Sequence, residues 1–90
     1  MTKVKLFSDL RDAANTNAVE ISSGVTVEEG LIELTEDIPQ LGDKIYGENG
    51  DIKEGINVFV NGKNISTLDG KNTVLKEEDD LAIFKPLGGG

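Results

Sequence analysis

The stretch INVFVNGKNI, residues 56–65, decides the fold more than any other segment of the chain. Apolar and polar side chains alternate over its first five residues, which predicts a strand with one buried face, because successive strand residues point to opposite sides. Asn61-Gly62 follows, the pair that two-residue hairpin turns favour, since both turn positions need a positive φ. Residues 63–65 then predict a short return strand. The stretch is therefore expected to form a β-hairpin.

Three further strands are expected around this hairpin. Thr2–Phe7 and Ala18–Ser22 both alternate between polar and apolar residues and predict half-buried strands. Between them, Ser8–Asn17 contains Asn and Asp turn formers, which predicts a loop that joins the two strands as a hairpin. Leu81–Phe84 predicts the last strand.

A helix is expected between the second and third strands. Thr26 and Glu29 have the spacing of a capping box, in which each side chain satisfies a free backbone N–H group. Gly30 costs a helix about 1 kcal/mol relative to alanine, which predicts close packing at that position. Pro39 helps to end the helix. Its apolar face is formed by side chains that recur every three or four residues: Val27, Leu31, Leu34 and Ile38.

The element order β-β-α-β-β-β predicts an α+β domain of two layers, with one main helix on one face of a mixed sheet of four to five strands. The segment Gly42–Gly55 is rich in Gly, Asp and Glu and is expected to be a surface excursion, anchored through a short helical turn by Leu41, Ile45 and Tyr46. The chain of 90 residues suffices for one domain, and it shows no internal repeat.

The three phenylalanines, Phe7, Phe59 and Phe84, all fall in the outward phase of their strands. If those strands are neighbours, the rings form an exposed apolar patch. Each ring can bury roughly 150–250 Å², and exposed apolar patches of that combined size usually mark binding sites. The alternative is that the Gly42–Gly55 excursion covers the rings.

The chain is acidic, with 17 acidic and 9 basic residues and a formal net charge of −8. Such a surface repels phosphate backbones, so nucleic-acid binding is not expected. The charge favours either a partner with a positive docking surface or solubility alone.

The chain has no cysteine and no histidine, which excludes disulfides, thiol nucleophiles and the usual zinc sites. The acidic run Glu77–Asp80 lacks the spacing of a calcium loop and is expected to be a solvated turn. No apolar run is long enough to span a bilayer and the first residues lack a signal-peptide core, so a cytoplasmic protein without membrane contact is expected.

The chain ends in Pro86-Leu87-Gly88-Gly89-Gly90. Without Cβ atoms the three glycines cannot form an ordered element unaided, and a partner with a narrow channel can thread them. The alternative is an ordinary disordered tail or a remnant of cloning. Residues 1–86 are expected to form the domain, and residues 87–90 a flexible tail.

Three segments resemble the ubiquitin-like sulfur carriers. INVFVNGKNI resembles their "NVxVNGxxI" segment, and LAIFKPLGGG, residues 81–90, resembles their closing "AIFPPVxGG". Residues 4–7 and Leu10-Arg11 are similar to the first strand and the "LR" after it. The resemblance is greatest to the small subunit of molybdopterin synthase (MoaD type) and to the small archaeal modifier proteins. Two residues depart from the pattern: Lys85 stands where the family often has Pro, and Gly88 stands where it often has Ala or Ser.

The resemblance implies the ubiquitin-like β-grasp fold and a protein that is not itself an enzyme. An E1-like adenylating enzyme would use ATP to activate Gly90, which would then accept sulfur as a thiocarboxylate for molybdopterin-type synthesis. The chain itself has no phosphate-binding motif for ATP and no bound cofactor is expected. Phe7, Phe59 and Phe84 would dock the body while Pro86 to Gly90 enter the enzyme.

Two other functions remain open. The activated glycine can instead form an isopeptide bond with lysines of target proteins, as a covalent modifier does. A non-covalent binding module is the third hypothesis, and it predicts that deletion of Gly89 and Gly90 has no effect. The large subunit of molybdopterin synthase is a candidate partner under the first hypothesis.

Overall fold

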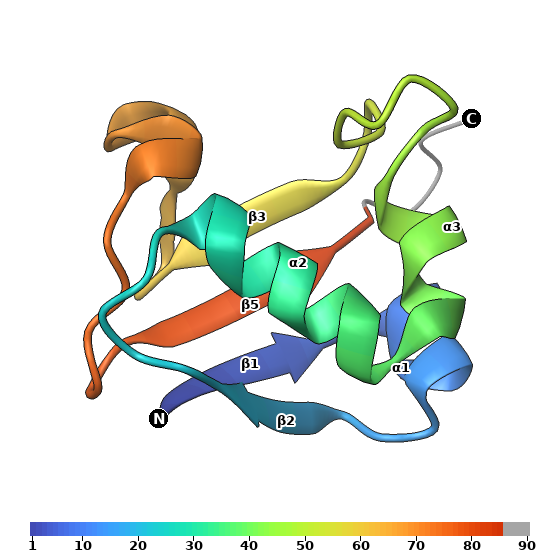
Figure 1. Cartoon of the computed structure of the whole chain (residues 1–90), viewed down its shortest axis with the longest axis horizontal. Coiled ribbons are helices and arrows are strands. Elements are labelled where there is room, and N and C mark those ends of the chain that lie inside the picture. Colours follow the sequence, from blue (N-terminus) through green and yellow to red (C-terminus); the bar gives the residue numbers. More distant parts are fainter. Residues whose placement is uncertain (86–90) are drawn as a thin grey trace.

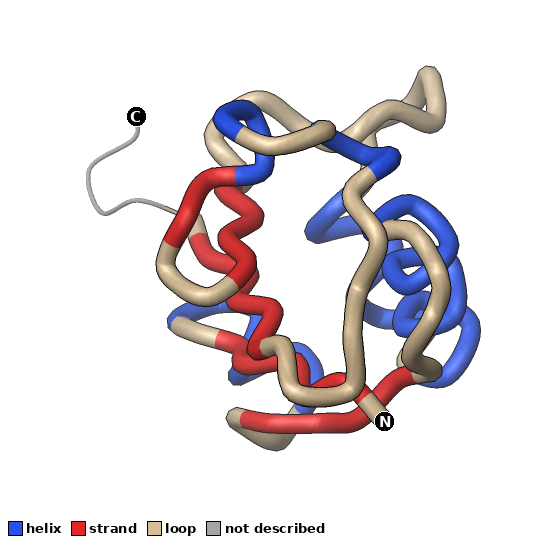
Figure 2. Tube along the Cα trace, turned by 90° about the vertical axis from the view of Figure 1, so that its left-hand side faces the viewer, coloured by secondary structure: helices blue, strands red, loops and turns tan. Residues whose placement is uncertain are grey.

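The structure is a computed structural model of the chain, and it describes residues 1–85. A sheet of five strands is packed against one long helix, with shorter helices at one end (Figures 1 and 2). The strands are β1 (Thr2–Leu6), β2 (Ala18–Ile21), β3 (Asn57–Val60), β4 (Lys63–Asn64) and β5 (Asp80–Phe84). The helices are α1 (Ser8–Ala14), α2 (Val27–Asp37) and α3 (Gly42–Ile45), with 3₁₀ turns at Pro39–Leu41, Ile65–Thr67 and Gly70–Asn72.

The strand order in the sheet is β2-β1-β5-β3-β4. The first and last strands of the chain, β1 and β5, lie side by side and run parallel, whereas the other neighbouring strands are antiparallel. The expected mixed sheet and α+β class are therefore confirmed. β5 lies in the middle of the sheet, between β1 and β3.

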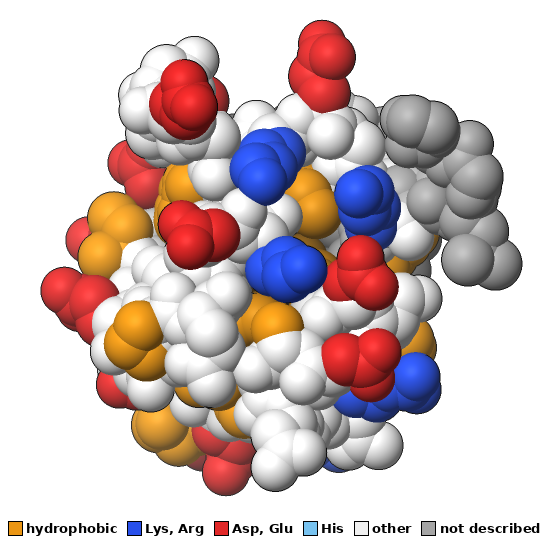
Figure 3. All heavy atoms as spheres, turned by 90° about the vertical axis from the view of Figure 1, so that its right-hand side faces the viewer, with side chains coloured by type: hydrophobic (Ala, Val, Ile, Leu, Met, Phe, Trp, Pro, Cys, Tyr) orange, Lys and Arg blue, Asp and Glu red, His pale blue; other side chains and the backbone are white. Residues whose placement is uncertain are grey.

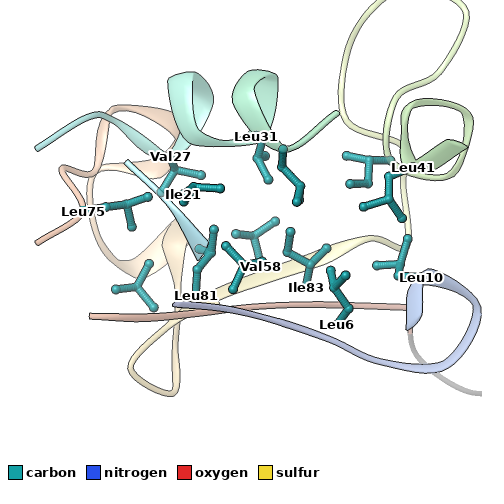
Figure 4. Close-up of a cluster of buried hydrophobic side chains, with 14 residues drawn as sticks. Leu6, Leu10, Ile21, Val27, Leu31, Leu41, Val58, Leu75, Leu81 and Ile83 are labelled. Atoms are coloured by element: carbon teal, nitrogen blue, oxygen red, sulfur yellow. The ribbon is translucent and has the colours of Figure 1, made fainter. Parts of the chain in front are cut away.

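The core lies between α2 and the sheet (Figure 4). The predicted strand phases are confirmed, because the inward side chains of β1, β3 and β5 are all buried. The fully buried side chains of the core include Val4, Leu6, Leu10, Ile21, Val27, Leu31, Leu34, Leu41, Ile45, Leu75, Leu81 and Ile83.

The capping box at the start of α2 is confirmed. The side-chain oxygen of Thr26 accepts a hydrogen bond from the backbone N–H of Glu29 at 3.2 Å, and the Glu29 carboxylate accepts one from the backbone N–H of Thr26 at 2.9 Å. The close packing expected at Gly30 is also confirmed. A Cβ atom at Gly30 would lie 2.7 Å from Cδ1 of Ile21, so any larger residue here would force the Ile21 side chain to shift.

The hairpin turn between β3 and β4 has the predicted geometry, with φ of 51° at Asn61 and 82° at Gly62. The return strand is one residue shorter than expected, since Ile65 already begins a 3₁₀ turn. The excursion after α2 contains the expected short helix, α3. Ile45 in α3 and Leu41, which ends the 3₁₀ turn before it, are fully buried, and Tyr46 is partly buried against the core.

The prediction for Ser8–Asn17 was wrong in one respect. β1 and β2 do pair in antiparallel fashion, but α1 rather than a loop connects them. Leu10 is buried in the core and holds this helix against the body, while Asn15, with φ of 58°, ends it in the left-handed conformation. Asn15, one of the expected turn formers, therefore ends a helix at a place where only a loop was expected.

The predicted boundary between domain and tail, after residue 86, lies outside the described residues. In the part of the chain that is described, no helix is long and apolar enough to cross a membrane.

Candidate functional site

The three phenylalanines are brought together by the order of the strands. Phe84 is the last residue of β5, and Phe59 comes from β3, the neighbour of β5 on one side. Phe7 follows the last residue of β1, the neighbour on the other side, and keeps an extended backbone with φ of −130° and ψ of 154°. All three rings therefore lie on the sheet face opposite the core, as predicted.

The rings contact one another with Phe84 in the centre. The ring centroids of Phe7 and Phe84 are 6.3 Å apart and the rings meet edge to face at 89°. The centroids of Phe59 and Phe84 are 5.1 Å apart, with 47° between the ring planes. Phe7 is the most exposed of the three, at 44%. Pairs of this kind stabilise the fold by about 0.5–1.5 kcal/mol each.

These rings surround an open hollow of about 540 Å³, which we call the aromatic hollow. Ala82 lies opposite Phe59 on the neighbouring strand, and its small side chain leaves space between the rings. Ser8, Gly62 and Lys85 complete the lining. No residue of Gly42–Gly55 is part of this lining in the described chain, so the alternative in which the excursion covers the rings is not supported.

The aromatic hollow lies at the point where the chain leaves the sheet. Lys85, which directly follows Phe84, is part of its lining. The other site residues expected from the sequence, Pro86, Leu87, Gly88, Gly89 and Gly90, lie outside the described residues. The structure thus brings the three predicted docking residues together, and one of them, Phe84, is separated from this segment in the sequence by Lys85 alone.

A second hollow, of about 150 Å³, lies on the other side of Lys85 and was not predicted from the sequence. Lys44 and Lys53 line it together with Lys85, beside the carboxylates of Asp9 and Glu54. Figure 3 shows several basic side chains on this end of the molecule, with acidic side chains among them. No local signal could have identified the group, because its members lie far apart in the sequence.

The acidic side chains of the chain are most concentrated on one helix. Helix α2 carries five acidic side chains and no basic one: Glu28, Glu29, Glu33, Glu36 and Asp37. Burial, reinforced by the negative charge of Glu28, raises the pKa of Tyr46 above its ordinary value of 10.0. In residues 1–85, no group of three or more carboxylates is placed to hold a metal ion.

Comparison with known proteins gives consistent matches over almost the whole chain. A model described as the ThiS family matches residues 4–90. Small archaeal modifier protein 1 of Haloferax volcanii is 33% identical over 88 residues, which covers 96% of this chain and 97% of that protein. The solution structure of small archaeal modifier protein 1 from Methanosarcina acetivorans has a TM-score of 0.90 at 37% identity, and the match covers 99% of this chain and 95% of that one. A chain of the crystal structure of the Amycolatopsis orientalis BexX/CysO complex shares the fold, with a TM-score of 0.84 at 23% identity and coverage of 100% of both chains.

Proposed function

The chain belongs to the ThiS family, and from this premise we propose that its C-terminal Gly90 is activated by an E1-like adenylating enzyme that consumes ATP. The fold is the ubiquitin-like β-grasp fold of its structural neighbours, and the chain is a ubiquitin-like carrier or modifier protein. Proteins of this kind are generally not enzymes themselves. The reactive group is therefore its own terminal carboxylate, and the catalytic machinery belongs to the partner.

Activation is needed because a free carboxylate is a poor electrophile. In the proposed step, a carboxylate oxygen of Gly90 attacks the α-phosphorus of ATP and pyrophosphate leaves, which makes an acyl-adenylate. A nucleophile from the partner or target then attacks the carbonyl carbon, and AMP leaves. Hydrosulfide-level sulfur as the nucleophile gives a thiocarboxylate at Gly90, whereas the ε-amino group of a lysine gives an isopeptide bond, and a proton is released in both cases.

The observation that carries the proposal is the aromatic hollow at the end of β5. The three rings and Ala82 form an apolar surface, and only Lys85 separates Phe84 from the segment that would enter the partner's active site. Aromatic residues that fill well-packed pockets supply most of the binding energy in protein interfaces. Phe7, Phe59 and Phe84 therefore dock the body of the domain, and Pro86, Leu87, Gly88, Gly89 and Gly90 reach the site of ATP chemistry.

Two fates of the activated glycine are retained. As a sulfur carrier, the protein would deliver sulfur in molybdopterin-type synthesis, with the large subunit of molybdopterin synthase as its second partner. As a modifier, it would be joined to lysines of target proteins, a role that the names of its relatives from Haloferax volcanii and Methanosarcina acetivorans support. Both fates use the same activation step and the same docking surface.

The test is the mass of the C-terminal peptide of the protein purified from its native cells. A free peptide with sulfur in place of one terminal oxygen is expected for the carrier, and a Gly90 remnant branched on lysine for the modifier. The matched control is a variant that lacks Gly89 and Gly90, which should show neither product while its circular dichroism stays unchanged. An unmodified carboxylate in every fraction would contradict the proposal and favour a non-covalent binding module.

A further inference from the structure

Three lysines form a basic group beside the point where the chain leaves the sheet. Lys44, Lys53 and Lys85, which we call the lysine cluster, line one hollow although they come from α3, the loop after it and the end of β5. They make up a third of the nine basic residues of a chain whose net charge is −8. The three like charges in this hollow repel one another, and the two carboxylates of Asp9 and Glu54 beside them offset only part of that repulsion.

The cluster is held in place by the backbone around it. The loop after α3 folds back, so that the backbone N–H of Lys53 donates a hydrogen bond to the carbonyl of Ile45 at 2.8 Å. Nζ of Lys53 donates another to the carbonyl of Asp43 at 2.6 Å, next to Lys44 in α3. Ile45 is fully buried and fixes this helix to the core. The lysines therefore project from a defined scaffold.

The cluster does not neutralise itself within the part of the chain described. The ion pairs among residues 1–85 use other cations, namely the N-terminus, Lys5, Arg11 and Lys71. Asp9 and Glu54 line the same hollow without forming an ion pair to any of the three lysines, and the five charged side chains together leave a charge of +1 there. Helix α2 contains no basic residue, and Lys71, from outside the helix, forms an ion pair with its Glu28.

We propose that the lysine cluster binds carboxylate side chains on the protein that receives residues 86–90. This inference rests on the proposed function and adds the chemistry of the partner. Lys85 lines both hollows, so a partner seated on the aromatic hollow must also face the cluster. The partner's surface therefore combines an apolar side chain for the aromatic hollow with acidic side chains beside it.

This arrangement orients the encounter. The negative face of α2 is repelled by an acidic partner surface, while the cluster is attracted to it, so the domain approaches with Lys85 and the rest of the cluster toward the partner. Complementary charges of this kind raise association rates and fix orientation more than they raise affinity. The overall net charge alone favours a basic partner, and the local arrangement of lysines reverses that expectation at the docking surface.

The first test compares the charge-reversed variant K44E/K53E with the wild type in ATP–pyrophosphate exchange catalysed by the adenylating enzyme of the same organism. Loss of two exposed ion pairs with the partner should raise the KM of K44E/K53E roughly two- to thirtyfold and leave kcat unchanged. The matched control K71E/K76E changes the net charge equally in the segment 70–76, at the opposite end of the molecule in Figure 1, and should leave KM within about twofold. Equal KM values for both variants would overturn the inference, while no exchange with the wild type would contradict the proposed function instead.

The second test does not depend on activation. The ¹⁵N-labelled wild-type protein is titrated with the blocked peptides EEFEE and QQFQQ, whose central Phe probes the aromatic hollow. EEFEE should shift the amide signals of Lys44, Lys53 and Lys85, and K44E/K53E should abolish those shifts, whereas QQFQQ should affect only the aromatic hollow. Identical shifts with both peptides, or no change in the variant, would show that the cluster does not bind carboxylates. Circular dichroism of K44E and of the double variant controls for folding.

Discussion

Replacing Phe84 with alanine is the most direct test of the docking surface, because its ring contacts both other rings of the aromatic hollow. The substitution removes two aromatic pairs, with centroid separations of 6.3 and 5.1 Å. At about 0.5–1.5 kcal/mol each, the two pairs contribute about 1–3 kcal/mol of folding stability beyond the burial of the ring itself. A small domain with about 5–15 kcal/mol retains its fold after such a loss.

The effect on partner binding should be larger. Central aromatic residues of interfaces cost about 2 kcal/mol or more when truncated, which corresponds to roughly a thirtyfold rise in KM for ATP-dependent activation. Urea unfolding followed by circular dichroism gives the stability, and pyrophosphate exchange gives the KM. Val58→Ala is the matched control, because Val58 is only 3% exposed and faces the core, so truncation lowers stability by about 2 kcal/mol without changing the aromatic hollow.

The two variants separate docking from stability. F84A should lose activation while V58A, with similar stability, retains it. If both variants keep a KM close to that of the wild type, Phe84 does not dock the partner. If F84A fails to fold, its ring belongs to the core of the domain, and the docking hypothesis loses its main support.

Three further predictions concern the fold. Gly30→Ala should lower the free energy of unfolding in urea by about 1 kcal/mol. The new Cβ atom would lie 2.7 Å from Cδ1 of buried Ile21, and this overpacking costs more than alanine gains in helix propensity. A more stable variant would contradict this reasoning. Gly62→Ala should cost about 1–2 kcal/mol, measured by thermal unfolding, because a φ of 82° strains any residue with a Cβ atom, and an unchanged Tm would refute the turn geometry. The absorbance of Tyr46, the single tyrosine, should titrate with a midpoint above 10.0, and Glu28→Gln should lower that midpoint without restoring the ordinary value, because burial is the larger cause. The raised pKa means that the folded chain favours the neutral phenol. The stability that this group contributes is therefore complete below pH 10 and is lost as the pH rises above it. A titration midpoint at or below 10.0 would contradict the burial of the ring.

The two hollows suggest how a strongly acidic protein recognises its partner. The aromatic hollow is apolar and lies on the sheet, whereas the lysine cluster lies at the adjacent end of the domain, and Lys85 borders both. Apolar burial supplies affinity and charge supplies orientation. Residues 86–90 follow Lys85 in the sequence, so under the proposed function the orientation of the domain decides whether they reach the partner's active site.

The sequence by itself determined the features that depend on neighbours in the chain. Alternation placed Val4, Val58 and Leu81 inside and the phenylalanines outside, because side chains in a strand point to alternate faces. The capping box and the Asn61-Gly62 turn could also be predicted from the sequence, since each involves residues at most three positions apart. The three glycines at residues 88–90 could be identified in the same way, because the absence of a side chain is a property of each residue alone and depends on no distant contact.

Only the tertiary structure decided which distant segments meet. Helix α1 was missed because its stability comes from burial of Leu10 against the core rather than from a strong local signal. The contact of Phe7 with Phe84 requires β5 to lie parallel beside β1, a pairing between the two ends of the chain. The lysine cluster likewise requires α3, its folded-back loop and the end of β5 to converge. Local patterns specify which way each side chain points, but burial of the whole apolar surface selects the strand order, and that order determines which outward side chains become neighbours.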